Sequence, residues 1–126
     1  MQAKVSYLSD QKFNLETWKR ELRFHFNEMD TFQEKLEEIA ARNYDKRALK
    51  SVEVFQNRIM IEKNEISKLM RRCKRKMQNI AVADLTEDID GRLQHEQGKL
   101  KGDMRQYIRM HYDLKEDMMD FFSKWL

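Results

Sequence analysis

Apolar residues recur along three stretches of the chain at alternating spacings of three and four. This spacing is typical of the a and d positions of a coiled coil, whose side chains interlock along a seam between helices. We therefore expect an all-α fold of three long amphipathic helices. The first stripe is Leu15, Trp18, Leu22, His25, Met29, Phe32, Leu36 and Ile39. The second is Ala48, Val52, Phe55, Ile59, Glu62, Ile66, Leu69, Cys73, Lys76 and Ile80. The third is Leu93, Gln97, Leu100, Met104, Tyr107, His111, Leu114, Met118, Phe121 and Trp125.

The three stripes align when the chain is folded antiparallel. Facing residues in an antiparallel pair have numbers that add up to a constant, which is 87 or 88 for the first two stripes, as for Leu36 with Val52. For the second and third stripes the constant is 166, which pairs Ile59 with Tyr107. These registers predict turns near residues 44 and 83. The expected architecture is an antiparallel three-helix up-down-up bundle, a long coiled-coil rod.

Local turn chemistry agrees with both positions. Asn43 tolerates the left-handed conformation that ends helices, and Asp45 is a good N-cap. Residues 84–87 have the spacing of a capping box, which predicts the start of the third helix. We expect the first helix to end near residue 42, the second to span about 46–81 and the third to run from about 85. Residues 1–9 are either a loose N-terminal arm or an early start of the first helix.

The composition supports a single domain over residues 1–126. The chain has no proline, three glycines and 37% charged residues, as long helices and coiled coils do. Gly91, Gly98 and Gly102 weaken the predicted third helix, because glycine costs about 1 kcal/mol relative to alanine in a helix interior. Neither a signal peptide nor an apolar run of membrane-spanning length is visible. We expect a cytoplasmic protein without a membrane partner.

The sequence contains none of the familiar catalytic or cofactor motifs. It has no glycine-rich phosphate loop and no HExxH or GxSxG motif, and its three histidines lack the Glu-x-x-His spacing of di-iron bundles. Cys73 is the single cysteine and occupies a core position, so a disulfide within the chain is excluded. We expect a non-enzymatic protein with no catalytic residue, cofactor or metal.

Two polar residues interrupt the apolar stripes at facing positions. The numbers of His25 and Glu62 add up to 87, so the predicted register places them opposite each other. A buried carboxylate needs a partner, and we expect a buried polar pair that sets the register of the helices. The alternative is a ligand-binding site or small enzyme centred on His25, Glu62 and Tyr107. His111 and Gln97 are expected to be satisfied polar groups at the edge of the seam.

The second helix is strongly basic. Residues 46–79 hold eleven Lys and Arg against three Asp and Glu, while the flanking helices are acidic. Clustered cations suit the phosphate backbone of nucleic acids. An alternative function is therefore nucleic-acid association, with contacts from Arg71, Arg72, Lys74 and Arg75.

Apolar residues in excess of the seam concentrate toward the C-terminal half of the third helix. Such residues usually mark an interface. We expect a helical interaction or scaffold module whose partner is a second copy, giving a homodimer, or a heterologous helix. The up-down-up topology is similar in outline to spectrin-type repeats, a likeness of fold alone. The expected interface residues are Ile108, Tyr112, Met119, Phe122, Trp125 and Leu126.

Overall fold

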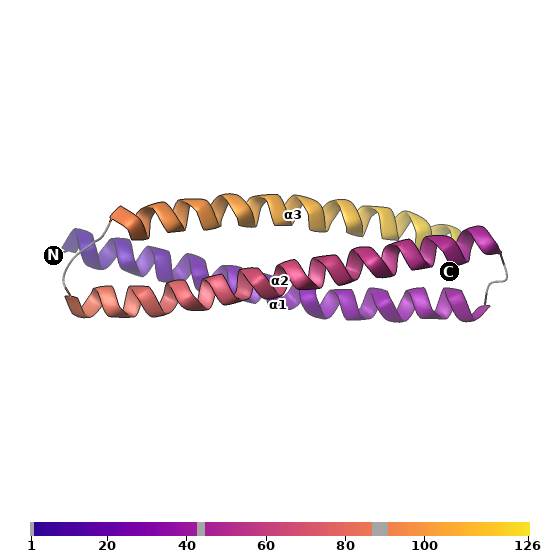
Figure 1. Cartoon of the computed structure of the whole chain (residues 1–126), viewed down its shortest axis with the longest axis horizontal. Coiled ribbons are helices and arrows are strands. Elements are labelled where there is room, and N and C mark those ends of the chain that lie inside the picture. The colour runs from indigo at the N-terminus through magenta and orange to yellow at the C-terminus, as the bar shows by residue number, and fades with distance from the viewer. Residues whose placement is uncertain (1, 43–44, 87–90) are drawn as a thin grey trace.

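The computed structural model is a rod of three long helices (Figure 1). It describes the backbone of residues 2–42, 45–86 and 91–126, and the side chains of 9–42, 45–82 and 97–126. Helix α1 spans Gln2–Arg42, α2 spans Lys46–Thr86 and α3 spans Gly91–Trp125. A helix of 41 residues is about 60 Å long. The predicted all-α three-helix bundle is confirmed, and the described residues contain no strand.

The helices run up, down and up, so α1 and α3 are parallel and α2 is antiparallel to both. Figure 1 shows the α1 and α2 ribbons crossing near the middle of the rod, with α3 along one side. Asp45 caps α2 as predicted, because its Oδ1 accepts the backbone N–H of Arg47 at 2.8 Å. The guanidinium of Arg47 also donates to this carboxylate and holds its pKa below the usual value. Asn43 and Tyr44, predicted to form the turn, lie outside the described residues.

Of the two alternatives for residues 1–9, the early helix start is confirmed: helix α1 begins at Gln2, and residues 2–9 do not form a loose arm. Two limits predicted for the other helices are wrong. Helix α2 continues to Thr86, five residues beyond the predicted end, and α3 begins at Gly91. The capping-box residues Asp84, Leu85 and Thr86 therefore extend α2 and do not start α3.

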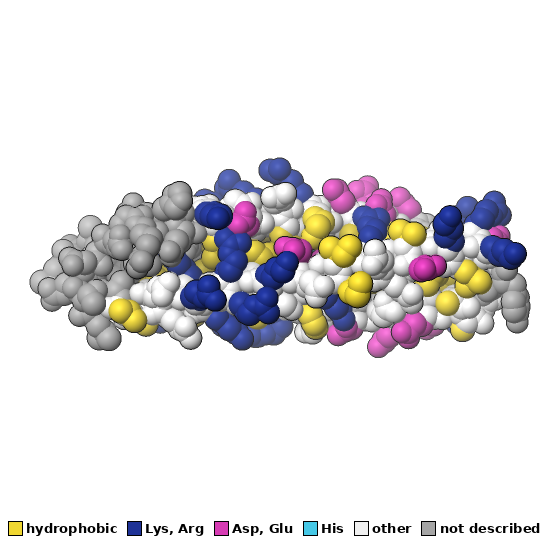
Figure 2. All heavy atoms as spheres, viewed as in Figure 1, with side chains coloured by type: hydrophobic (Ala, Val, Ile, Leu, Met, Phe, Trp, Pro, Cys, Tyr) yellow, Lys and Arg dark blue, Asp and Glu magenta, His cyan; other side chains and the backbone are white. Residues whose placement is uncertain are grey.

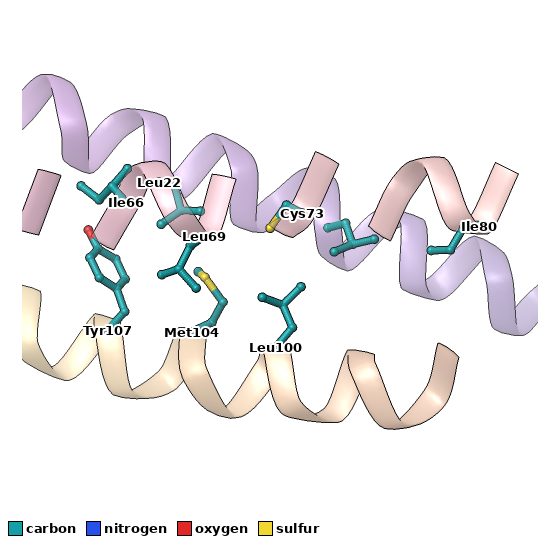
Figure 3. Packing of buried hydrophobic residues seen from close by; sticks show 9 residues of the cluster. Leu22, Ile66, Leu69, Cys73, Ile80, Leu100, Met104 and Tyr107 are labelled. Carbon is teal, nitrogen blue, oxygen red and sulfur yellow. The ribbon is translucent and has the colours of Figure 1, made fainter. Parts of the chain in front are cut away.

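The core follows the predicted stripes closely. Of the stripe residues with described side chains, all are buried except Trp18, Phe55 and Trp125, which are partly buried and pack against the core. Two clusters divide the core, one containing Leu22, Ile66 and Met104 and the other containing Met29 and Leu114. The layer between them is polar. Figure 3 shows Leu69 beside Met104 and Ile66 near Tyr107 in the first cluster.

The predicted register between α2 and α3 is wrong by one heptad. Glu62 meets His111 at 2.9 Å, and the rings of Phe55 and Phe121 lie 5.1 Å apart. The numbers of these pairs add up to 173 and 176, where the sequence predicted 166. A slip of seven residues leaves every a and d position in the seam, so apolar periodicity cannot distinguish the two registers. The two registers differ in which polar core residues face each other. In the register that the structure adopts, Glu62 faces His111 and the second turn lies beyond residue 83.

Candidate functional site

A polar layer crosses the middle of the core. His25 is 4% exposed and Glu62 is 1% exposed, in agreement with the expectation that both are buried. The partner of each differs from the prediction. His111, which is fully buried, donates from Nδ1 to Glu62 Oε2 at 2.9 Å, while His25 Nδ1 shares a 2.9 Å hydrogen bond with the Tyr107 hydroxyl. His111 is therefore a central member of the layer and not a residue of the seam edge.

The two imidazole rings are stacked. The ring centroids of His25 and His111 are 3.7 Å apart with an angle of 7° between the planes. Burial, followed by the nearby charge of His111, lowers the pKa of His25 to about 4, so His25 is neutral at pH 7. Burial also raises the pKa of the Tyr107 hydroxyl, which stays protonated. The His25–Tyr107 hydrogen bond is therefore a neutral one.

Glu28 of α1 and Lys115 of α3 complete the layer. Glu28 Oε1 lies 3.4 Å from His111 Nε2, and Glu28 Oε2 accepts from Lys115 Nζ at 3.0 Å. The contact with His111 lacks hydrogen-bond alignment, and Glu28 Oε1, Glu62 Oε1 and His111 Nε2 are buried without a hydrogen-bond partner. Glu28 and Lys115 were missed by the sequence analysis because they flank the stripes. Placing the polar core positions Glu62 and His111 opposite each other would have revealed both the layer and the register.

The polar layer lies away from three clefts on the surface of the described residues. These clefts have volumes of about 250, 330 and 380 Å³, and His25, Glu62 and His111 line none of the three. No group of three or more His, Cys, Asp and Glu side chains in the described part of the chain is placed to hold a metal ion. Cys73 is fully buried, and burial raises the pKa of its thiol to about 11. Such a thiol is a poor nucleophile near neutral pH.

The outer surface of α3 carries a second apolar line. Tyr112, Met119 and Leu126 follow one another at seven-residue intervals and are 54%, 52% and 53% exposed. We call these three residues the outer seam. They lie on the side of α3 that faces α1, since Tyr112 contacts the His25 ring edge-on with centroids 6.4 Å apart.

The remaining predicted interface residues are partly covered by their own chain. Phe122 packs against the core and lies 5.9 Å from the Phe32 ring, measured between centroids. Trp125 packs on the same cluster, and Ile108 packs on the other one. Half of the predicted interface set is thus exposed, and the other half is partly buried against the core.

The four residues predicted to contact nucleic acid lie on the part of the α2 surface between the clefts that separate α2 from α1 and from α3. Arg71, Lys74 and Arg75 are exposed, whereas Arg72 is half-buried and donates to Asp103 of α3 at 2.7 Å. Clefts flank this face on both sides. One of about 250 Å³ separates α2 from α3 and is lined by Arg72 and Arg75, and one of about 330 Å³ separates α2 from α1 and is lined by Arg71 and Lys74.

Comparison with known protein families, with curated proteins and with solved structures finds no match. None of the helices, where the structure describes them, is both long enough and apolar enough to cross a membrane.

Proposed function

We propose that this protein is a non-enzymatic helical interaction module that self-associates through the outer seam of α3. The observation that carries the proposal is the heptad spacing of Tyr112, Met119 and Leu126, three half-exposed apolar side chains on a rod whose inner seam is already filled. Apolar residues at seven-residue intervals form a stripe that a further helix covers. An exposed line of this kind is typical of an interface.

A second, antiparallel copy is the occupant that matches the outer seam. A two-fold axis near Met119 places Tyr112 of each copy opposite Leu126 of the other, so that the two outer seams cover each other. Closed two-fold pairs are the commonest soluble oligomers.

The expected association is weak. Each outer-seam side chain has about half of its surface left to bury, which contributes roughly 1 kcal/mol. Six such side chains in a symmetric pair contribute about 6 kcal/mol before the cost of lost rotational and translational freedom. A micromolar dissociation constant needs about 8 kcal/mol net, so we expect the dimer to become populated only toward high micromolar concentration.

Sedimentation of Met119→Asp tests this proposal. Met119 is 52% exposed, so the substitution leaves the core intact while it puts a carboxylate into the middle of the interface. Phe122→Asp also weakens the proposed dimer, but Phe122 packs against the core and its loss disturbs the fold as well. We expect the wild type to dimerise between low and high micromolar concentration and Met119→Asp to remain a monomer.

Phe13→Asp is the matched control. Phe13 is 63% exposed on α1 and lies outside the outer seam, so its replacement by aspartate should leave the dimer unchanged. The proposal is refuted by a wild-type monomer at high micromolar concentration. It also fails if both variants weaken association equally, because the loss would then reflect general surface charge.

A further inference from the structure

The tertiary structure gathers cations from all three helices at one level of the rod. Residues 12–23 of α1, 66–76 of α2 and 97–109 of α3 together hold fourteen Lys and Arg against three Asp and Glu. We call these three segments the basic belt. The remainder of the rod toward the α3 C-terminus, residues 28–42, 45–62 and 113–126, holds eight against twelve. In the view of Figure 2, Lys and Arg gather to the left of centre, Asp and Glu lie mainly to the right of them, and further Lys and Arg lie at the right end.

The contacts between helices confirm that the three segments lie side by side. Arg23 of α1 lines the α1/α2 cleft with Arg71 and Lys74, and Lys99 of α3 lines the α2/α3 cleft with Arg75. The α2 face therefore presents cations in two hollows and on the ridge between them. Charges that the chain carries on three separate segments converge there.

Most of these cations lack an acidic partner. Among the described residues, Arg23, Arg71, Lys74, Arg75 and Lys99 make no ion pair. Cations outside the belt are paired more often. Examples are Arg58 with Asp117 at 2.9 Å and Lys115 with Glu28 at 3.0 Å. Like charges held together repel one another, and a bound polyanion removes that repulsion.

We propose that the basic belt binds the phosphate backbone of double-helical nucleic acid across the α2 face. Phosphate oxygens match the charge and the donor geometry of arginine, and backbone neutralisation requires clustered cations without any base-reading motif. A single strand is disfavoured because the one aromatic residue lining either cleft, Phe26, is half-buried with Lys63 Nζ 4.8 Å from its ring centroid. Such a ring offers no free stacking platform. A flat lipid surface is disfavoured because some of the cations line clefts beside α2. The protruding phosphates of a duplex fit such clefts better than a planar membrane surface does.

Binding of a fluorescein-labelled DNA duplex, followed by fluorescence anisotropy, tests the proposal. The belt variant is Arg71→Glu with Arg75→Glu, two exposed positions on α2. The matched control is Lys46→Glu with Lys50→Glu, which makes the same change in net charge at exposed positions in the first turns of the same helix. We expect the belt variant to lose affinity by about tenfold or more and the control by less than about threefold. Circular dichroism verifies that both variants keep the helical fold.

Salt dependence and competing anions supply the remaining outcomes. If the five unpaired cations each contact a phosphate, a plot of the logarithm of the binding constant against the logarithm of salt concentration should have a slope of about −4.5. The proposal is overturned if the duplex does not bind at low salt, or if belt and control variants lose affinity equally. Tighter binding to poly-glutamate or to anionic phospholipid vesicles than to the duplex also overturns it. The belt variant leaves Tyr112, Met119 and Leu126 intact, so none of these results bears on self-association.

Discussion

The contact between Glu62 and His111 offers the sharpest test of the core. Glu62→Ala removes the carboxylate that accepts the His111 Nδ1 hydrogen bond at 2.9 Å, in a layer where both side chains are 1% exposed. The imidazole N–H is then left in the core without this acceptor. The variant measures what the polar layer contributes to stability.

The expected loss in free energy of unfolding is about 2–4 kcal/mol. Loss of a hydrogen bond to a charged group costs about 1.5–3 kcal/mol, and breaking a fully buried pair costs up to about 3–5 kcal/mol. Glu28 lies 3.4 Å from the other ring nitrogen of His111 and still offsets part of the imidazole's desolvation, which argues against the upper end.

Urea unfolding followed by circular dichroism, at pH 7 and one protein concentration, gives these values. A double-mutant cycle with His111→Leu should show a coupling energy of at least about 1 kcal/mol, because the two groups interact directly. The double variant Glu62→Leu with His111→Leu should recover much of the loss, since apolar residues can replace a buried pair. Glu53→Ala, at an exposed position of α2, is the control and should change stability by less than about 0.5 kcal/mol.

Two results would refute the reasoning about this layer. A loss below about 1 kcal/mol for Glu62→Ala would mean that the carboxylate is solvated or has another partner. A coupling energy near zero between Glu62 and His111 would contradict the α2/α3 register, since a shift by one heptad separates these residues by about 10 Å.

Three further measurements follow from the same structure. The pKa of His25 is lowered to about 4 in the folded protein, whereas in the unfolded chain it is near 6.5, so the unfolded chain takes up the proton first as pH falls. The free energy of unfolding should therefore decline by about 3 kcal/mol between pH 6.5 and pH 4. Urea unfolding of the wild type and of His25→Leu across this range should show a steeper dependence of stability on pH for the wild type. Cys73, fully buried and with its pKa raised to about 11, should react with a maleimide only after unfolding, and fast labelling of the native protein would contradict its placement. A Cβ at Gly98 or Gly102 meets nothing within 4 Å, so Gly98→Ala and Gly102→Ala should each raise the free energy of unfolding by up to about 1 kcal/mol, and lower stability in either variant would show that the glycine is required.

Much of the fold could be predicted from the sequence because a coiled-coil seam is a local, periodic property. Spacings of three and four determine which face of each helix is apolar, and the structure buries that face from Leu15 through Met118. The Asp45 cap could also be predicted, since it needs only the backbone N–H of Arg47 two residues away. The capping-box pattern at residues 84–87 was misleading because its residues are equally compatible with the continuing turns of α2.

The relative shift of α2 and α3 could not be obtained from periodicity. If one helix slides by seven residues, apolar a and d positions still face apolar a and d positions, so only individual polar side chains distinguish the two registers. Glu62 needs a buried donor, and His111 provides it only in the register that the structure adopts. With this shift His25 turns to Tyr107 and stacks on His111, and the predicted pair becomes a layer built from all three helices.

The sequence by itself determined the number of helices and their buried faces, since each depends on spacing within one helix. Tertiary structure decided what meets across helices. It selected the register through the few polar core groups, and it brought Arg23, Arg75 and Lys99 to one level of the rod. Summed along the sequence, charge is divided by helix, with a basic α2 between acidic neighbours. In the folded rod the charge is divided along the long axis, because side-by-side packing brings together residues that are far apart in sequence. Electrostatic interactions depend on that distance in space.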